Sequence, residues 1–241
     1  MRALIKLHSY YLFHLKTQRM LWLLLLMIIG MFVITSGLFS NRQLFLDYKT
    51  FWFEYRIESV GFMKLSSLCL IFYMVIQLYF YKTYDTMLLQ LKSKTSIYLS
   101  KTILMVLTMS LFWLTSTLFF GVIGRLSGFN IGGNALVQYW IKGTLFSMFY
   151  IVFFSLVTHM INHILGLFMP FIGWFLIELM HNPMQNNGNF GVLDKIFRLF
   201  FFSFFASYDA LFTIEINLIY VLFIMLLMIG ITLLIMNKKT L

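Results

Sequence analysis

Six apolar runs, each close to the length needed to cross a lipid bilayer, constrain the fold of this chain more than any other feature. A helix needs about 20 mainly apolar residues to cross a hydrocarbon core about 30 Å thick. Charged residues make up only 11% of the 241 positions, whereas a typical soluble domain has roughly 25%. The connections are short, so we expect one all-α, polytopic transmembrane domain over residues 1–241 and no separate soluble domain. Its six transmembrane helices are predicted at 20–39, 60–81, 102–124, 139–157, 164–180 and 216–236.

The net charge of +10 indicates contact with anionic lipid and not with nucleic acid, because the basic residues flank apolar runs and form no long Lys/Arg run. With the N-terminus in the cytoplasm, ten Lys and Arg residues fall on the inner side and eight on the outer side. This is the excess that the positive-inside rule favours. We therefore expect both termini to be cytoplasmic. The single cysteine, Cys69, lies inside an apolar run and excludes an internal disulfide.

Two further segments have the character of interfacial helices. Residues 1–19 are predicted to form an amphipathic helix in the inner headgroup layer, although an ordinary basic flank of a membrane anchor gives the same pattern. Its apolar stripe comprises Leu4, Leu7, Tyr11 and Leu15, while Lys6, Ser9 and Lys16 face away. Residues 191–215 contain the aromatic run 196–205, which is too short to span at about 15 Å of helix. We expect a re-entrant or interfacial segment there, with an aromatic belt as the alternative.

The connection at 82–101 is the most informative stretch of the chain. Asp85 and Thr86 have the residue types that start or cap a short helix. The apolar side chains that follow, Met87, Leu88 and Leu91, are bordered by Lys92 and Lys94 and need a surface to bury against. That surface is either another helix of the chain or a soluble partner protein.

This connection resembles the coupling segment of ABC-2 type permease subunits of ATP-binding cassette exporters. In that family the second span leads into an acidic residue, Gly-Thr, paired leucines, a turn, and a lysine that opens the third span. The matching residues here are Asp85-Thr86, Leu88-Leu89, Ser93 to Ser96, Tyr98 and Lys101. The chain departs from the pattern because Asp85 stands at the glycine position and Lys94 or its neighbours replace the turn proline.

The resemblance implies a permease that dimerises with itself or with a second permease and is driven by a separate ABC ATPase. ATP and magnesium would then be bound by the partner ATPase, and this chain would need no cofactor. The chain contains no G-x-x-x-x-G-K-[ST] phosphate loop, which agrees with the family's arrangement, in which a separate subunit binds ATP. The resemblance assigns the contact with the ATPase to Tyr84, Asp85, Thr86, Leu88, Leu89 and Leu91.

The small size of the chain is similar to that of bacterial permeases that export, or give immunity against, lantibiotics and other antimicrobial peptides. This implies a multi-pass protein of the bacterial cytoplasmic membrane with an amphipathic peptide as substrate, whose binding residues the sequence does not identify. A non-transporting immunity or assembly factor that binds a peptide or a partner protein is the alternative from another class.

Enzymatic readings have weaker support in the sequence. His159 and His163 have the spacing of the zinc motif H-E-x-x-H, but Met160 stands where the general base must be. We therefore expect no metal site, and we place the two histidines in a polar turn between the fourth and fifth spans. Glu178, Asp209 and Glu215 fall near predicted outer ends of helices, where water solvates them, so they do not indicate proton coupling.

Overall fold

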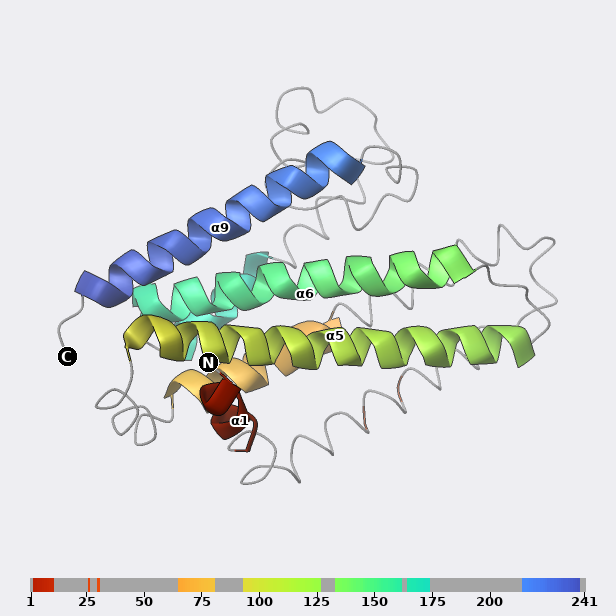
Figure 1. Cartoon of the computed structure of the whole chain (residues 1–241), viewed down its shortest axis with the longest axis horizontal. Helices are drawn as coiled ribbons and strands as arrows, with labels where there is room; N and C mark the ends of the chain where they lie inside the picture. The colour runs from red at the N-terminus through yellow and green to blue at the C-terminus, as the bar shows by residue number, and fades with distance from the viewer. Residues whose placement is uncertain are drawn as a thin grey trace. The chain divides into compact units, whose positions relative to one another are not determined.

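The computed structural model describes residues 2–10, 26, 30, 65–80, 93–126, 133–161, 164–173 and 214–238. These residues are helical apart from Ser93, and the described part of the chain contains no strand. The prediction of an all-α chain is confirmed for these residues. In chain order (Figure 1), the helices are α1 (Arg2–Tyr10), the helix Leu65–Phe80 with its π-helical last turn η3 (Ile76–Phe80), α5 (Lys94–Leu126), α6 (Gly133–Ile161), the 3-10 turn η4 (Ile164–Phe168) and α9 (Ile214–Lys238).

Among the described residues, two helices are long and apolar enough to cross a bilayer by length and composition, over Lys94–Phe119 in α5 and Tyr139–Ile161 in α6. They overlap the predicted third and fourth spans, 102–124 and 139–157. The helix α5 begins at Lys94 and not near Thr102, so the last part of the predicted connection is helical. The helix α6 continues through His159 to Ile161, which places this histidine in the helix and not in a turn.

The other predicted spans are described in part. The helix Leu65–Phe80 falls in the predicted second span, α9 covers the predicted sixth, and η4 with the helical residues 169–173 begins the predicted fifth. Of the predicted first span, only Leu26 and Gly30 are described, and both are helical. The predicted re-entrant segment at 191–215 lies outside the described residues except for its last two positions, which begin α9.

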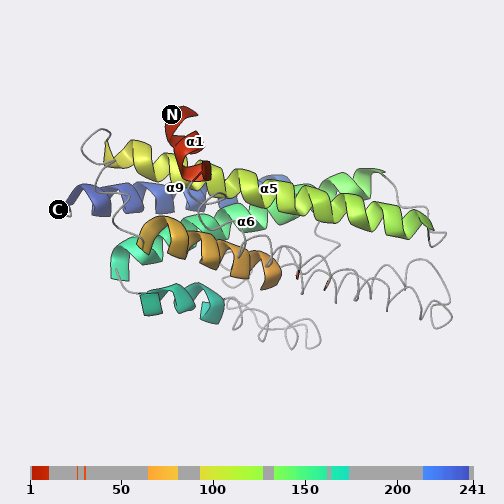
Figure 2. The ribbon, with the colours of Figure 1, turned by 90° about the horizontal axis from the view of Figure 1, so that it is seen from below.

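The chain divides into two compact units, Met1–Ile151 and Val152–Leu241. In the first unit, α5 is the central helix, and α1 contacts it near its beginning. The helix Leu65–Phe80 and α6 both run antiparallel to α5, and Figure 2 shows the helix Leu65–Phe80 and α1 beside the first half of α5. The core of this unit therefore lies where these helices meet α5.

The contact between α5 and α6 centres on Trp113, whose side chain is 2% exposed. Its indole Nε1 donates a hydrogen bond of 2.8 Å to Ser147 Oγ, and its ring centroid lies 5.5 Å from that of Tyr139 in an edge-to-face arrangement. A Cβ atom built on Gly143 would overlap the indole. Trp140 makes the reciprocal contact, donating from Nε1 to the carbonyl of Ser110 at 3.1 Å. The two helices approach closely because a glycine leaves room for the tryptophan ring.

In the second unit, the end of α6 packs against the segment that follows it. Phe154 meets Phe171 edge to face with a centroid distance of 5.6 Å, and Leu167 in η4 is fully buried. Gly166 lies against the side chain of Ile161, so the chain turns tightly after α6. The helix α9 has two faces. Met225, Met228 and Thr232 are buried, whereas Leu222, Phe223, Leu226, Leu227 and Leu234 are exposed.

Candidate functional site

The predicted coupling residues lie outside the described residues. Tyr84, Asp85, Thr86, Leu88, Leu89 and Leu91 all fall within 81–92. What the structure does describe is the two ends of this connection, η3 on one side and Ser93 with the first turns of α5 on the other. The candidate site is therefore defined by these two ends and by the helix α1, which packs beside them. We call this group the junction.

A buried lysine links the two ends of the connection. Lys101 lies about two turns into α5, and its Nζ donates a hydrogen bond to the carbonyl of Leu78 in η3. The carbonyls in the last turn of a helix have no donor within the helix, and a cation is favourable at this negative end of the helix dipole. The lysine thus joins the end of the helix Leu65–Phe80 to the beginning of α5.

The environment of Lys101 is largely apolar. Its side chain is 2% exposed, and the ammonium lies 4.8 Å from the centroid of the Tyr79 ring. An ammonium group taken out of water needs hydrogen bonds or a π face to offset its desolvation. The Leu78 carbonyl and the Tyr79 ring supply both, so the side chain is held in one place.

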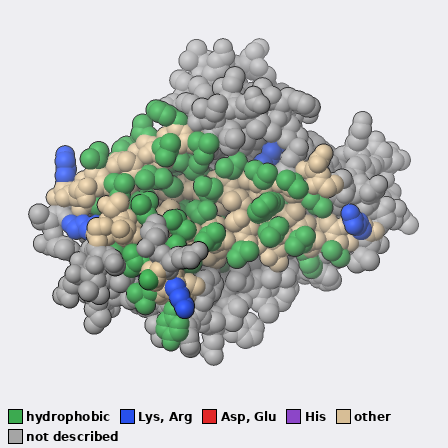
Figure 3. Space-filling model, viewed as in Figure 1, with side chains coloured by type: hydrophobic (Ala, Val, Ile, Leu, Met, Phe, Trp, Pro, Cys, Tyr) green, Lys and Arg blue, Asp and Glu red, His purple; other side chains and the backbone are tan. Residues whose placement is uncertain are grey.

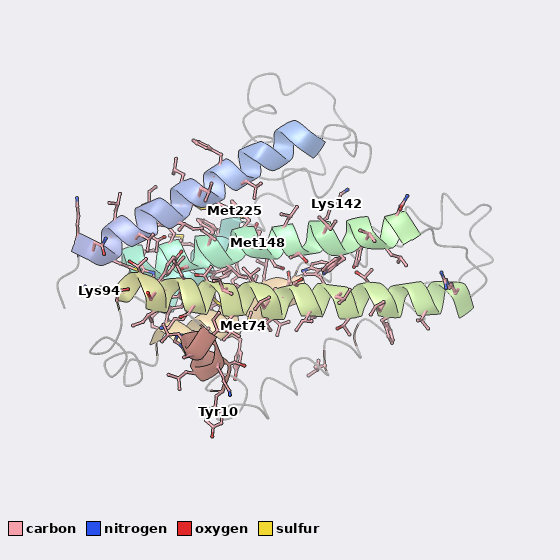
Figure 4. The ribbon with its side chains drawn as sticks, in the orientation of Figure 1. Tyr10, Met74, Lys94, Lys142, Met148 and Met225 are labelled. Carbon is pink, nitrogen blue, oxygen red and sulfur yellow. The ribbon has the colours of Figure 1, made fainter. Side chains whose placement is uncertain are left out.

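Ser93 begins α5 as its N-cap residue. The backbone N–H of Ser96 donates to Ser93 Oγ at 3.3 Å, and the N–H of Ile97 donates to the Ser93 carbonyl at 3.2 Å. Ser93 Oγ also donates to Ser96 Oγ at 2.9 Å. Serine at this position satisfies amide donors that a helix start otherwise leaves open. The segment from Ser93 to Ser96, which the family resemblance matches to a turn, is thus a capped helix start. Figure 4 shows Lys94 at this end of α5.

The helix α1 packs onto α5 through one narrow face. Leu4 is 5% exposed and His8 is fully buried, one helical turn apart, and the positive charge of Lys101 acts on His8. The predicted apolar stripe is divided, because Leu4 is buried while Leu7 is 41% exposed. Tyr10 is exposed and points away from α5 (Figure 4). The docked face of α1 is therefore formed by Leu4 and His8.

Burial, and secondarily the positive charge of Lys101, lowers the pKa of His8 from 6.5 to about 4. The histidine is thus neutral when α1 is docked at neutral pH. Undocked, its imidazole regains a pKa near 6.5 and binds a proton below that pH. The free energy that favours docking of α1 on α5 is therefore largest above about pH 6.5, and it decreases as the pH falls from 6.5 towards 4.

We expect α1 to dock more weakly at pH 5 than at pH 7.5, by about 1–2 kcal/mol. The measurement is the labelling rate of a cysteine at the buried position Leu4, in a Cys69→Ala background, at the two pH values. The variant His8→Gln carries no titrating group at this position and serves as the control. An equal pH response in this variant would assign the effect to another group.

The structure does not bring the two histidines and the carboxylates of the sequence analysis together within its described residues. His159 Nδ1 lies 2.7 Å from the carbonyl of Ser155 in the preceding turn of α6, and His163 lies outside the described residues. Glu178 and Asp209 also lie outside them, whereas Glu215 falls in the first turn of α9. Among the described residues, no group of three or more His, Cys, Asp or Glu is placed to hold a metal ion.

Comparisons with protein-family models, with curated proteins and with solved structures give no match for this chain.

Sequence reasoning missed the docking role of His8 and the inward direction of Lys101. Spacing gives a signal for the first, because His8 lies four residues after Leu4 and shares its face of the helix. For Lys101 the sequence carries no comparable signal, because the predicted span begins at residue 102 and leaves this lysine at the end of the connection 82–101.

Proposed function

We propose that this chain is an integral membrane protein, the permease subunit of an ATP-driven ABC exporter in the bacterial cytoplasmic membrane. Two permease subunits, identical or similar, would enclose a pathway for an amphipathic or antimicrobial peptide. A separate ABC ATPase, which binds ATP and magnesium, would drive transport through the connection 81–92. The observation that carries the membrane part of this proposal is the exposed face of α5.

One side of α5 is a mainly apolar stripe. Its exposed members recur every three or four residues, as expected for a single helical face: Ile103, Leu107, Leu111, Leu118 and Val122, with exposed Thr115 between them. No charged residue occurs between Lys101 and Arg125. Figure 3 shows hydrophobic side chains along this face of α5 and basic side chains at both of its ends.

The length of this stripe fits the bilayer. From Ile103 to Val122 the helix rises about 28 Å, close to the roughly 30 Å of a hydrocarbon core. Leu111 is 63% exposed and Leu118 60%, and a contiguous apolar stripe of this length is a liability in water but suits lipid acyl chains. Trp113 lies on the opposite side of α5 and contacts α6, and Lys101 contacts the helix Leu65–Phe80.

The junction lies at one end of this stripe. Lys101 precedes Ile103 by two residues, and α1 docks at the same level with exposed Lys6 and Tyr10 on its outer side. Tyrosine and lysine are side chains suited to the boundary between lipid and water. A junction at this depth agrees with a cytoplasmic connection at 81–92 that a soluble ATPase can reach.

The exporter part of the proposal is supported by the resemblance of residues 85–101 to the ABC-2 coupling segment. The peptide substrate follows from the similarity in size and character to antimicrobial-peptide permeases.

The bilayer position of α5 is tested with fluorophores on single cysteines in proteoliposomes that contain brominated lipids. We expect a label at Leu111 to be quenched most by bromines near the terminal end of the acyl chain, because this residue lies near the midpoint of the stripe and so near the bilayer centre. A label at Lys94 should be quenched little by these bromines, because it lies at the end of α5. Equal quenching of both labels would contradict a spanning α5.

Transport is tested in inverted membrane vesicles that contain the permease and its ATPase. We expect ATP-dependent accumulation of a fluorescent cationic amphipathic peptide inside the vesicles. Vesicles with an ATPase that cannot hydrolyse ATP are the control. Accumulation that does not depend on ATP would contradict the exporter proposal.

A further inference from the structure

The bond between Lys101 and Leu78 spans the connection that carries the predicted coupling residues. Its two partners are 23 residues apart in sequence, and between them the chain leaves η3 at Phe80 and enters α5 at Lys94. Within the described residues, this bond and the Tyr79 contact join the two ends of the connection side by side.

We propose that Lys101 is a positioning residue that makes the end of the helix Leu65–Phe80 and the beginning of α5 move as one body. A force applied to the connection 81–92 is then delivered to both helices together and does not spread the two ends apart. This inference rests on the proposed function, because it assigns a role to Lys101 in transmitting movement from an ATPase.

The π-helical turn η3 depends on a contact from outside the helix. Such turns are rare and occur frequently at functional sites. In this turn Gln77 is 6% exposed, and its Oε1 accepts no hydrogen bond from the part of the chain that the structure describes. A buried amide oxygen without a donor destabilises its surroundings. The charged donor from Lys101 to the next residue, Leu78, offsets this cost and fixes the turn against α5.

The requirement is for a long cationic side chain. Methionine has similar length and flexibility but can neither donate to the Leu78 carbonyl nor interact as a cation with Tyr79. Arginine retains both capacities, with a differently shaped head group. The effect of Lys101→Met, compared with that of Lys101→Arg, therefore shows whether the hydrogen bond and the charge are needed or only a side chain of this volume. Lys142, on α6, points to the side away from α5 (Figure 4), so Lys142→Met is the matched control.

The first experiment is hydrogen exchange of the full-length protein in lipid nanodiscs. We expect Lys101→Met to speed exchange of the amides of 76–80 and 97–101 about tenfold, the factor that one hydrogen bond to a charged group typically carries. Lys101→Arg should retain most of the protection, and Lys142→Met should leave both segments unchanged. If the Lys101→Met variant exchanges as slowly as the wild type at both segments, the proposal is overturned.

The second experiment adds the ATPase and a non-hydrolysable ATP analogue. In the wild type, we expect nucleotide to change exchange in 76–80 and 97–101 together. In Lys101→Met the ATPase should still bind, but the change should be confined to one of the two segments. A joint change in this variant would overturn the transmitting role. Failure of the wild type to bind any ATPase would overturn the proposed function instead, while the first experiment still decides whether Lys101 joins the two ends.

Discussion

Replacing Gly143 with valine is expected to separate α5 from α6 and to destabilise the protein strongly. Even the first atom of a side chain at this position overlaps the Trp113 indole. The ring cannot move aside at low cost, since Ser147 Oγ accepts its N–H at 2.8 Å and Tyr139 packs against its edge. Overpacking of this kind costs about 1–3 kcal/mol, and more where a held ring must give up a hydrogen bond.

The measurement is the unfolding free energy in mixed detergent micelles, with the thermal midpoint as a second readout. Gly143→Ala provides a milder change if the valine variant does not accumulate, and adding Trp113→Leu to Gly143→Ala should recover part of the loss. The control is Gly230→Ala in α9, where nothing lies within 4 Å of a built Cβ. It should be neutral or stabilising by up to about 1 kcal/mol, because alanine favours the helix interior. A valine variant as stable as the wild type would contradict the close approach of the two helices.

The second large effect is expected at the paired leucines of the predicted coupling segment. Replacing both Leu88 and Leu89 with aspartate should leave membrane insertion intact but abolish association with the ATPase. If this apolar pair is buried against a soluble partner, two carboxylates placed there lose the apolar contact and add buried charge, a loss of several kcal/mol. Affinity purification of the permease, with the bound ATPase quantified, measures the effect.

Ser93→Asp provides a matched control for the added negative charge. Ser93 is exposed and caps α5, and aspartate is an equally good N-cap residue. This variant places a carboxylate close to the connection without altering its leucines, and it should retain the ATPase. Normal co-purification of the double aspartate variant would refute the coupling assignment at Leu88 and Leu89.

Three of the helical ranges followed from the sequence, because apolar length is a local property. The predicted spans 102–124, 139–157 and 216–236 all fall within single helices of the structure. Their ends were less predictable, since polar residues next to a span continue the helix when they can be capped or buried. The capped start at Ser93 extends α5 through Lys101, and the polar residues Thr158 and His159 remain inside α6.

The contacts between helices could not be predicted in the same way, because periodicity shows which face is apolar but not which element covers it. The sequence gives no indication that Trp113 packs against Gly143, because a glycine has no side chain. Lys101 counts as an inner basic residue in the positive-inside pattern, whereas the structure buries it against the Leu78 carbonyl. His8 contributes to no sequence motif, and its burial depends on the docking of α1 against α5. The six predicted coupling residues lie outside the described helices and stay a prediction.

The central claim, that this chain is the membrane half of an ATP-driven exporter, is tested most directly by its native partners. The protein is purified by affinity from its own membrane in a mild detergent, and the bound proteins are identified by mass spectrometry. The account predicts a Walker-motif ATPase at a ratio near one to one. An intact permease that carries no ATPase would contradict the account and favour a membrane factor that binds or shields a partner without transport.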